Sequence, residues 1–221
     1  MRVLINAASA HMGGSVTYLQ NVLRWLPETM SETQFVVYVP EKTRDRFPVH
    51  EHVSVYAYPY ASTRGLPRLY FDQIDIPRLI RQKNIDVLFS ATGFGTLWSP
   101  APQVLLVRNM AYFDPQFEAK YRELGRSVVK TRIRRWHSLL SIWAADAVLF
   151  PTRAMQEVVG TYVSLDEKST HSLHYGFDAE RFSEHGEARG DAPFDDLEQS
   201  ERRGPLLLNV STYAVHKNLE T

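Results

Sequence analysis

Short apolar runs alternate with longer amphipathic stretches along most of the chain. Short apolar runs are typical of strands buried on both faces, and amphipathic stretches are typical of the helices that cover them. The pattern predicts strands at Val3–Asn6, Gln34–Val39, Val53–Tyr58, Asp86–Ser90, Gln103–Val107, Ala147–Phe150 and Thr170–His174. It predicts helices at Ser15–Leu26, Pro67–Lys83, Arg126–Ala145 and Thr152–Val163, with a kink or break at Pro77, which has no backbone N–H. We therefore expect an α/β fold with a doubly wound, mainly parallel Rossmann-like sheet.

The composition changes after this alternating region. Residues 183–205 are rich in Gly, Glu, Asp and Arg and have almost no apolar residues, which is typical of a linker. Residues 206–221 contain one apolar run, Leu206–Val210, followed by a polar turn that carries Lys217. A lone strand and loop cannot bury a core. We therefore predict a complete domain at residues 1–182, a polar linker at 183–205, and the start of a truncated second domain at 206–221.

Composition and charge exclude several classes of protein. The 221 residues are 44% hydrophobic and 23% charged, and the 25 basic and 25 acidic side chains leave no net charge to attract nucleic acid. The chain has no cysteine, which excludes disulfides and thiolate metal sites, and its eight histidines are not spaced as metal ligands. We find neither a signal peptide nor an apolar run of the ~20 residues that a membrane span needs. We expect a cytoplasmic protein with no bound metal and no cofactor.

Two glycines follow the first predicted strand. Gly13 and Gly14 stand just before the predicted helix that begins at Ser15. Glycine lets a ligand approach the backbone closely, and the amide groups at a helix start attract anions. The spacing differs from the G-x-G-x-x-G dinucleotide motif. The two glycines therefore either contact a phosphate group or only turn the chain and start the helix.

Two further loops follow predicted strands. Gly93 and Gly95 lie in one of them, and Arg108 and Asn109 lie in the other. Open α/β sheets bind ligands at the carboxyl ends of their strands. The loop with the glycines either contacts a sugar or a phosphate or forms an ordinary tight turn. Arg108 either binds an anionic acceptor or pairs with a carboxylate such as Asp114.

Four stretches, in order along the chain, resemble group 1 glycosyltransferases, which are glycosyltransferase family four and have the GT-B fold. The Gly-Gly loop with the helix Gly14–Leu23 is similar to the start of that family. Ala145–Thr152 resembles the strand that ends the sheet of the first domain, and His174–Asp178, followed by Arg181-Phe182, resembles the segment before the domain crossover. Val210–Asn218 resembles the first strand and loop of the second domain.

The resemblance implies two Rossmann-like domains across a cleft, the first chiefly for the acceptor and the second for a nucleotide-sugar donor. It implies transfer of a sugar to a glycan or a lipid-linked acceptor with retention and without a bound metal. Gly13 and Gly14 would then approach the donor phosphates, and Lys217 would balance the diphosphate charge. Without the resemblance, Lys217 is a solvated loop lysine.

The chain departs from the family pattern at two points. Many members carry a His-Asp pair where this chain has Arg108-Asn109-Met110, so the role of that histidine is either missing or filled by Asn109. The paired glutamates that orient the donor in the family are not among these 221 residues. We therefore identify no catalytic residue, and we expect this fragment to fold but not to transfer sugar.

One predicted helix is strongly basic. The segment from Lys120 to His137 has seven Lys or Arg residues and one acidic residue. An apolar stripe at helical spacing runs along the same helix and consists of Val129, Ile133, Trp136, Leu140 and Trp143. Lys130, Arg134 and Arg135 lie away from that stripe. The helix Arg126–Trp143 therefore either makes a peripheral contact with anionic lipid or packs its stripe on the sheet with its basic face in solvent.

Two other functions remain open at this point. One is a different GT-B enzyme, such as a nucleotide-sugar epimerase. The other is a non-catalytic protein that binds an acceptor or acts as a scaffold. A gene that continues past Thr221 for ~150 residues with two spaced glutamates would identify the enzyme class.

Overall fold

A computed structural model describes residues 1–176 apart from 63, 126 and 167. Within it, Met1–Tyr175 forms one compact unit. The predicted linker at 183–205 and the predicted second-domain segment at 206–221, which includes Lys217, lie outside the described residues. The fold below is that of the compact unit.

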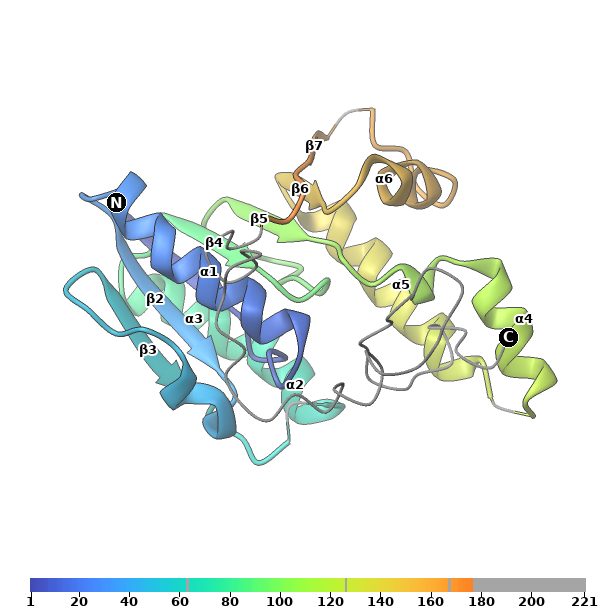
Figure 1. The fold of residues 1–221 in the computed structure, drawn as a ribbon, viewed down its shortest axis with the longest axis horizontal. Coiled ribbons are helices and arrows are strands. Elements are labelled where there is room, and N and C mark those ends of the chain that lie inside the picture. The colour runs from blue at the N-terminus through green and yellow to red at the C-terminus, as the bar shows by residue number, and fades with distance from the viewer. Residues whose placement is uncertain (63, 126, 167, 177–221) are drawn as a thin grey trace, which may run out of the picture. The chain divides into compact units, whose positions relative to one another are not determined.

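The unit alternates strands and helices along the chain (Figure 1). The strands are β1 (Arg2–Asn6), β2 (Gln34–Val39), β3 (Val53–Ala57), β4 (Val87–Ser90), β5 (Gln103–Leu106), β6 (Ala147–Phe150) and β7 (Ser169–Ser172). The α-helices are α1 (Gly14–Thr29), α2 (Leu66–Tyr70), α3 (Ile76–Gln82), α4 (Pro115–Glu123), α5 (Val129–Ala144) and α6 (Arg153–Gly160). Three shorter helical segments are η1 (Glu41–Arg46), η2 (Phe71–Asp75) and η3 (Met110–Tyr112).

The strands form a seven-stranded sheet in the order β3-β2-β1-β4-β5-β6-β7. Every neighbouring pair is parallel, with β1 between β2 and β4 in the register Val3↔Phe35 and Val3↔Val87. The chain leaves β1 toward β2 but leaves β4 toward β5, so its direction across the sheet reverses between β1 and β4. The predicted doubly wound parallel sheet is confirmed.

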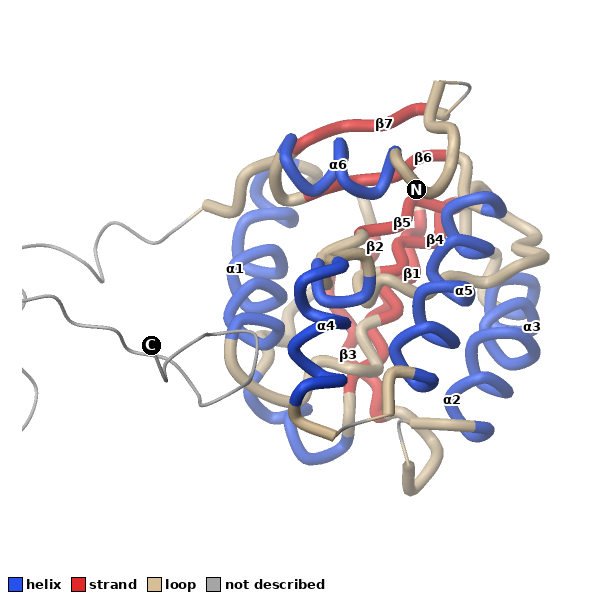
Figure 2. Tube along the Cα trace, turned by 90° about the vertical axis from the view of Figure 1, so that its right-hand side faces the viewer, coloured by secondary structure: helices blue, strands red, loops and turns tan. Residues whose placement is uncertain are grey.

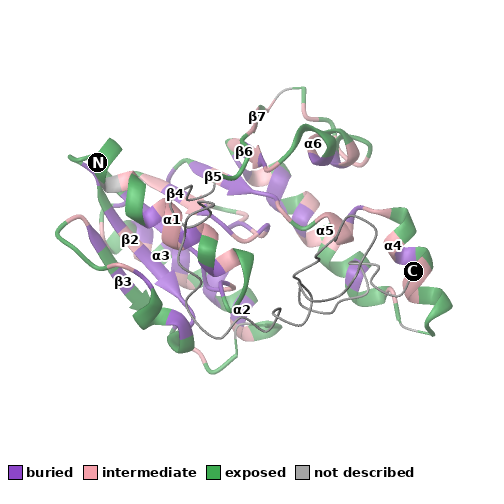
Figure 3. Ribbon diagram, in the orientation of Figure 1, coloured by how far each residue is buried: buried purple, intermediate pink, exposed green. Residues whose placement is uncertain are grey.

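Helices cover both faces of this sheet: α1 lies on one face, and α2, α3 and α5 lie on the other (Figure 2). Alternate residues of β1 face opposite ways, because successive side chains of a strand do so. Val3 and Ile5 belong to the core cluster that contains Leu19 of α1, whereas Leu4 belongs to the cluster that contains Ile80 of α3. A third cluster joins β5 and β6 to α5 and α6. Figure 3 shows the buried residues gathered on the strands and on the helix faces turned toward them.

The helix predicted at Pro67–Lys83 contains an irregular segment. A turn of α-helix, α2, leads into the π-helical segment η2, and α3 begins at Ile76 with a proline in its first turn. That proline is Pro77, and the run stays helical from Leu66 to Gln82, so the irregularity is a π-helical segment just before Pro77 and not a break in the helix. A proline is tolerated at a helix start because the missing N–H has no partner there in any case.

The sequence pattern missed one helix and misplaced the start of the next. Asp114 accepts a hydrogen bond from the Gln116 backbone N–H at 2.8 Å and so caps α4, whose first residue is Pro115. The helix predicted from Arg126 begins at Val129. Asp-Pro is a recognised helix-start signal, so α4 was within reach of sequence reasoning.

Candidate functional site at the carboxyl edge of the sheet

The loops that follow β1, β4 and β5 meet at one edge of the sheet. All strands are parallel, and these three are neighbours, so their carboxyl ends lie side by side. The reversal of chain direction between β1 and β4 opens a crevice at this edge in doubly wound folds. All of the candidate site residues that the structure describes follow these strands.

Gly13 and Gly14 begin α1 at this edge. Gly13 has φ 58° and ψ −144°, a conformation that residues with a Cβ rarely adopt, and its carbonyl accepts the first helical hydrogen bond, from Val16 N at 3.0 Å. No side chain caps α1, and its first turn contains no acidic residue. A Cβ added at either glycine would meet no atom of the described residues within 4 Å. The start of α1 is therefore open and electropositive, as an anion site requires.

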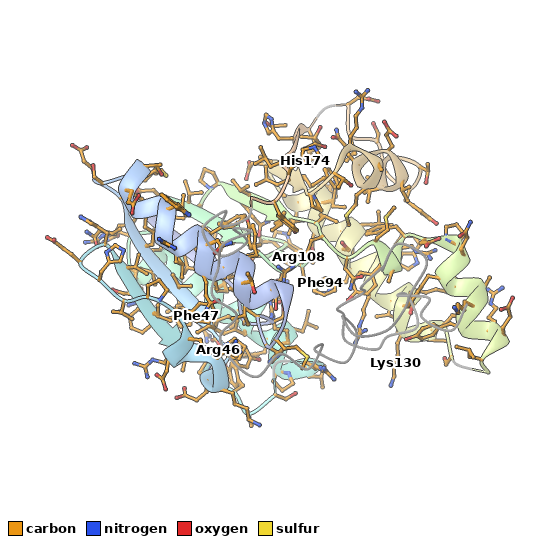
Figure 4. All side chains as sticks on the ribbon, viewed as in Figure 1. Arg46, Phe47, Phe94, Arg108, Lys130 and His174 are labelled. Carbon is orange, nitrogen blue, oxygen red and sulfur yellow. The ribbon has the colours of Figure 1, made fainter. Side chains whose placement is uncertain are left out.

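Arg108 connects the end of β5 to α1. Burial raises the pKa of Tyr175 and the nearby guanidinium of Arg108 opposes that rise, and the centroid of the Tyr175 ring lies 4.9 Å from that of Tyr18 in α1. Burial raises the pKa of Tyr18 to about 12, with a further rise from Tyr175, while the charge of Arg108 opposes that rise. Arg108 therefore lies beside α1, about one helical turn beyond Gly14. Figure 4 shows it between α1 and α5.

Asn109 and Asp114 have local structural roles. The Asn109 side chain accepts a hydrogen bond from Ala111 N at 3.2 Å and caps η3. Asp114 caps α4, so its carboxylate is engaged there rather than in the pair with Arg108 that the sequence allowed. Asn109 is exposed at the carboxyl edge, next to Arg108.

A buried polar cluster lies beneath the loops at the carboxyl edge of the sheet. The sequence analysis did not predict it. Asn6, the last residue of β1, donates to Asp72 Oδ1 at 2.7 Å, and Arg68 Nε donates to Asp72 Oδ2 at 2.7 Å. Arg68 also donates to Thr92 Oγ1 at 3.0 Å. Asn6 and Asp72 are fully buried, and Arg68 is 8% exposed. The cluster ties β1, α2, η2 and the loop after β4 together.

Asp72 lies in the π-helical segment η2. A π-helical turn inserts a residue relative to an α-helix, and such turns are frequent at functional sites. Thr96 Oγ1 donates to the backbone carbonyl of Asp72 at 2.8 Å, so the loop after β4 is attached to this turn as well. The only sequence signal for the cluster was a set of polar residues at positions where buried elements were predicted.

The loop Gly93–Gly95 is held on three sides. Ser138 of α5 donates to the Gly93 carbonyl at 3.0 Å, and Gln73 of η2 donates to the Gly95 carbonyl at 2.9 Å. Gln103 of β5 accepts from Thr96 N at 2.8 Å, and a Cβ at Gly95 would lie 2.8 Å from the same Gln103 oxygen. Internal hydrogen bonds occupy the Thr92 and Thr96 hydroxyls. The loop is a tightly fitted turn, which favours the structural interpretation of its glycines.

His137 of α5 packs on this loop. Its ring stacks on Phe94, with 4.8 Å between centroids and 14° between planes. Burial lowers the pKa of His137, with Asp72 raising it and Arg68 lowering it by smaller amounts, so the imidazole is neutral near pH 7. Its Nε2 is buried and has no hydrogen-bond partner in the described part of the chain. The sequence alone gave no reason to place this histidine near the carboxyl edge.

A pocket of about 450 Å³ lies elsewhere, beside α6 and β7. Arg153, Gln156, Glu157, Leu165 and Ser172 line it. The pocket contains none of the described candidate site residues, which all lie at the carboxyl edge of the sheet. In the described residues, no group of three His, Asp or Glu side chains is placed to hold a metal. None of the described helices is long and apolar enough to cross a bilayer.

Comparisons with known proteins identify the family and the fold. The model of Glycosyltransferase Family 4 matches residues 12–181. The fold is similar to Alr3699/HepE of Anabaena, solved with UDP and glucose, at TM-score 0.51 and 14% identity over 81% of this chain and 46% of that one. It is also similar to apo UGT2 of Phytolacca americana, at TM-score 0.50 and 10% identity over 82% of this chain and 53% of that one. A search of curated proteins finds no match. The chain spans about half the length of the solved structures that it resembles.

Proposed function

Because the chain belongs to glycosyltransferase family 4, we propose that it is the acceptor-side part of an enzyme that transfers a sugar from a nucleotide-sugar donor to a glycan or a lipid-linked acceptor. The family match carries the proposal, since it spans Gly13, Gly14, Arg108 and Asn109. The two solved structures support the fold of the first half. Alr3699/HepE, solved with UDP and glucose, makes a uridine nucleotide the first donor to test.

In this proposal the carboxyl edge supplies positive potential to the reacting groups. The open start of α1 faces the donor phosphates, and Gly13 and Gly14 leave room for them. Arg108 holds an anionic or hydroxyl-rich acceptor beside α1, and Asn109 takes the place of the family's histidine near the sugar. Lys217 balances the charge of the departing diphosphate, so no metal or cofactor is required.

Transfer with retention requires groups on both sides of the bond that breaks. Catalysis depends on binding the transition state more tightly than the substrates, and on holding donor and acceptor in register. The residues that would grip the nucleotide and the sugar belong to the second domain in this family. We therefore propose that these 221 residues alone bind donor weakly and turn over no sugar. A cytoplasmic location stays a prediction from the sequence.

The test uses UDP and UDP-glucose as probes. Calorimetric titration is expected to show affinity no tighter than about millimolar, because few contacts offset the cost of association. Amide NMR signals of Gly13 and Gly14 are expected to shift as the ligand binds. A side chain at position 14 meets open space, so Gly14→Asp and Gly14→Asn both fit. The charged variant should lose the shifts, and the neutral variant of the same shape should keep most of them.

Two results would contradict the proposal. Unchanged signals at Gly13 and Gly14 with a saturating nucleotide would remove the phosphate role of the loop. Micromolar affinity, or sugar transfer by this fragment, would place the donor site within the first domain. The fold alone does not separate a transferase from a nucleotide-sugar epimerase or from a non-catalytic acceptor-binding protein, and the family match favours transfer.

A further inference from the structure

Helix α5 presents its large apolar side chains to solvent. The stripe that sequence analysis identified is exposed along its whole length: Val129 58%, Ile133 63%, Trp136 67%, Leu140 46% and Trp143 69%. These five side chains fall within an arc of roughly 80° and extend over about 21 Å. The alternative in which the stripe packs on the sheet is therefore wrong.

The opposite face of α5 makes the contact with the domain, and most of its buried residues are small and polar. Thr131, Ser138, Ser141 and Ile142 are the residues buried there. Ser138 donates to the Gly93 carbonyl, and Ser141 donates to the His137 carbonyl at 2.8 Å. Small hydroxyl side chains let the helix approach the loop after β4 closely. Small hydroxyl residues thus share the attachment with Ile142 and the partly buried Leu139, whereas the larger apolar stripe lies outside.

The cations of α5 divide into two groups. Arg132 and Arg135 bind Glu118 of α4, with Arg135 Nη2 at 3.0 Å, and Arg135 also donates to the Tyr112 carbonyl. This corrects the expectation that Arg135 belongs to a solvated basic face. Lys130 and Arg134 remain exposed, away from the centre of the stripe, and the Arg134 guanidinium carbon lies 6.0 Å from the centroid of the Tyr112 ring. Helix α5 contains no carboxylate of its own.

A further cation lies at the end of the stripe. Lys168 Nζ donates to the carbonyls of Trp143 and Ala145 at 2.8 and 2.9 Å, at the carboxyl terminus of α5. Tryptophan and lysine side chains beside aliphatic ones are the residues that favour the boundary between lipid headgroups and acyl chains. Exposed, with Lys130 near one end and Lys168 at the other, the stripe has the chemistry of an interfacial helix.

We propose that α5 docks this domain on an anionic lipid bilayer, with the stripe in the headgroup boundary and Lys130 and Arg134 on lipid phosphates. A second copy of the chain fits less well. The stripe covers roughly 200 Å² if a helix is about 10 Å wide, against about 800 Å² per partner in a standard interface. A bilayer needs no complementary shape, and exposed cations beside apolar side chains suit it.

Docking through α5 brings the carboxyl edge close to the membrane. Helix α5 precedes β6 and runs antiparallel to it, so its Val129 end lies toward the carboxyl edge. His137 and Ser138 contact the loop after β4 at that same edge. Figure 4 shows Lys130 at the end of α5 that lies farther from the amino edge of the sheet. A lipid-linked acceptor would reach Arg108 and Asn109 without leaving the bilayer surface.

The inference deepens the proposed function but is tested without any sugar donor, so its failure would leave the transfer proposal standing. The assay is cosedimentation of the 221-residue chain with vesicles of phosphatidylcholine, with and without phosphatidylglycerol, at low salt. A stripe variant carries Trp136→Gln and Leu140→Gln. A charge variant carries Lys130→Gln and Arg134→Gln. Because the four side chains are exposed, the variants are expected to fold, which circular dichroism checks.

Matched controls lie on elements far from α5 in the sequence. Trp25→Gln removes a tryptophan of α1 that is 53% exposed, and Lys42→Gln with Arg44→Gln removes two exposed cations of η1. Binding to vesicles that contain phosphatidylglycerol is expected to weaken about thirtyfold in the charge variant and at least tenfold, in rough terms, in the stripe variant. The controls should bind as the wild type does.

Three outcomes would overturn the inference. One is a wild type that does not sediment with phosphatidylglycerol vesicles at low salt, and another is a stripe variant that binds as well as the controls. The third is a wild-type dimer in analytical ultracentrifugation that the stripe variant dissociates, which would identify a second copy as the occupant of α5. Loss of binding in both variants, with both controls retained and no dimer, supports docking on the bilayer.

Discussion

The buried charge at Asp72 gives the sharpest test of how the carboxyl edge is held. Asp72→Asn keeps the shape of the side chain but removes its charge. In the wild type both carboxylate oxygens accept hydrogen bonds at 2.7 Å, one from Asn6 and one from Arg68. The amide can accept only one of them, and the guanidinium of Arg68 is left in a buried position without a counter-charge.

The magnitude follows from that burial. The side chains of Arg68 and Asp72 are 9% and 0% exposed, so solvent screens the pair very little. Removing one partner of a buried ion pair costs about 3–5 kcal/mol, and the acceptor that asparagine retains places this variant near 3 kcal/mol. The expected loss is a large fraction of the roughly 5–15 kcal/mol that stabilises a typical domain. With an m-value of about 2 kcal/mol/M, the urea midpoint is expected to fall by about 1.5 M.

Urea unfolding followed by circular dichroism measures this loss. Asp45→Asn, an exposed carboxylate of η1, is the matched control and is expected to change stability by no more than about 0.5 kcal/mol. Adding Arg68→Met to Asp72→Asn removes the unpaired guanidinium, so the double variant should lose less than the sum of the two single changes. A midpoint for Asp72→Asn equal to that of the control would refute the argument.

Two further substitutions test the fit of this domain. Gly95→Ala is expected to lower the free energy of unfolding in urea by about 1–3 kcal/mol, because its Cβ would lie 2.8 Å from the buried, hydrogen-bonded oxygen of Gln103. The control is Gly160→Ala, whose Cβ makes only an ordinary contact at 3.8 Å. A cost for Gly95→Ala no larger than that of the control would contradict the prediction. Glu118→Gln should cost about 1–2 kcal/mol at neutral pH, since hydrogen bonds from arginine lower the pKa of Glu118. The stabilisation by the Glu118 carboxylate is present above the ordinary pKa of 4.5 and is lost as the pH falls through the lower pKa of the folded state. Glu118→Gln should therefore lose less stability on acidification than Glu157→Gln, an exposed control that keeps Glu118.

The strands were predictable because each buried one contains its own apolar run. Gln34–Val39 was predicted to the residue, and β1 and β4 were displaced by a single residue at one end. The edge strand β7 was the least well placed, since Ser169–Ser172 contains no strongly apolar residue. Strands with an apolar run of their own were thus located to within one residue at either end, and the strand without one was not.

The support beneath the candidate site was not predictable in the same way. Asn6 and Asp72 are 66 positions apart, and nothing in either neighbourhood indicates that they meet. The π-helical turn that aims Asp72 at β1 has no local signature that we recognise. Gly13 and Arg108 were found because they directly follow strands, which is a local property. Contacts between distant segments require the folded chain.

The position of α5 illustrates a different limit. Periodicity identified a helix and its apolar stripe, but it cannot show which side of a helix faces the domain. Burial reverses the usual assignment, with Ser138 inside and Trp136 outside. The solvent exposure of the side chains, and not the period of the apolar pattern, shows which face of α5 is buried.

This reversal changes what selection can act on in α5. Ser138 is buried and donates to the Gly93 carbonyl, so a larger replacement there would push the helix away from the loop after β4. The packing of the domain places no such constraint on the large residues outside, so a change there would alter what the helix docks on without altering how it is attached. The docking surface at Ile133, Trp136 and Leu140 can therefore be redesigned separately from the scaffold that holds the candidate site.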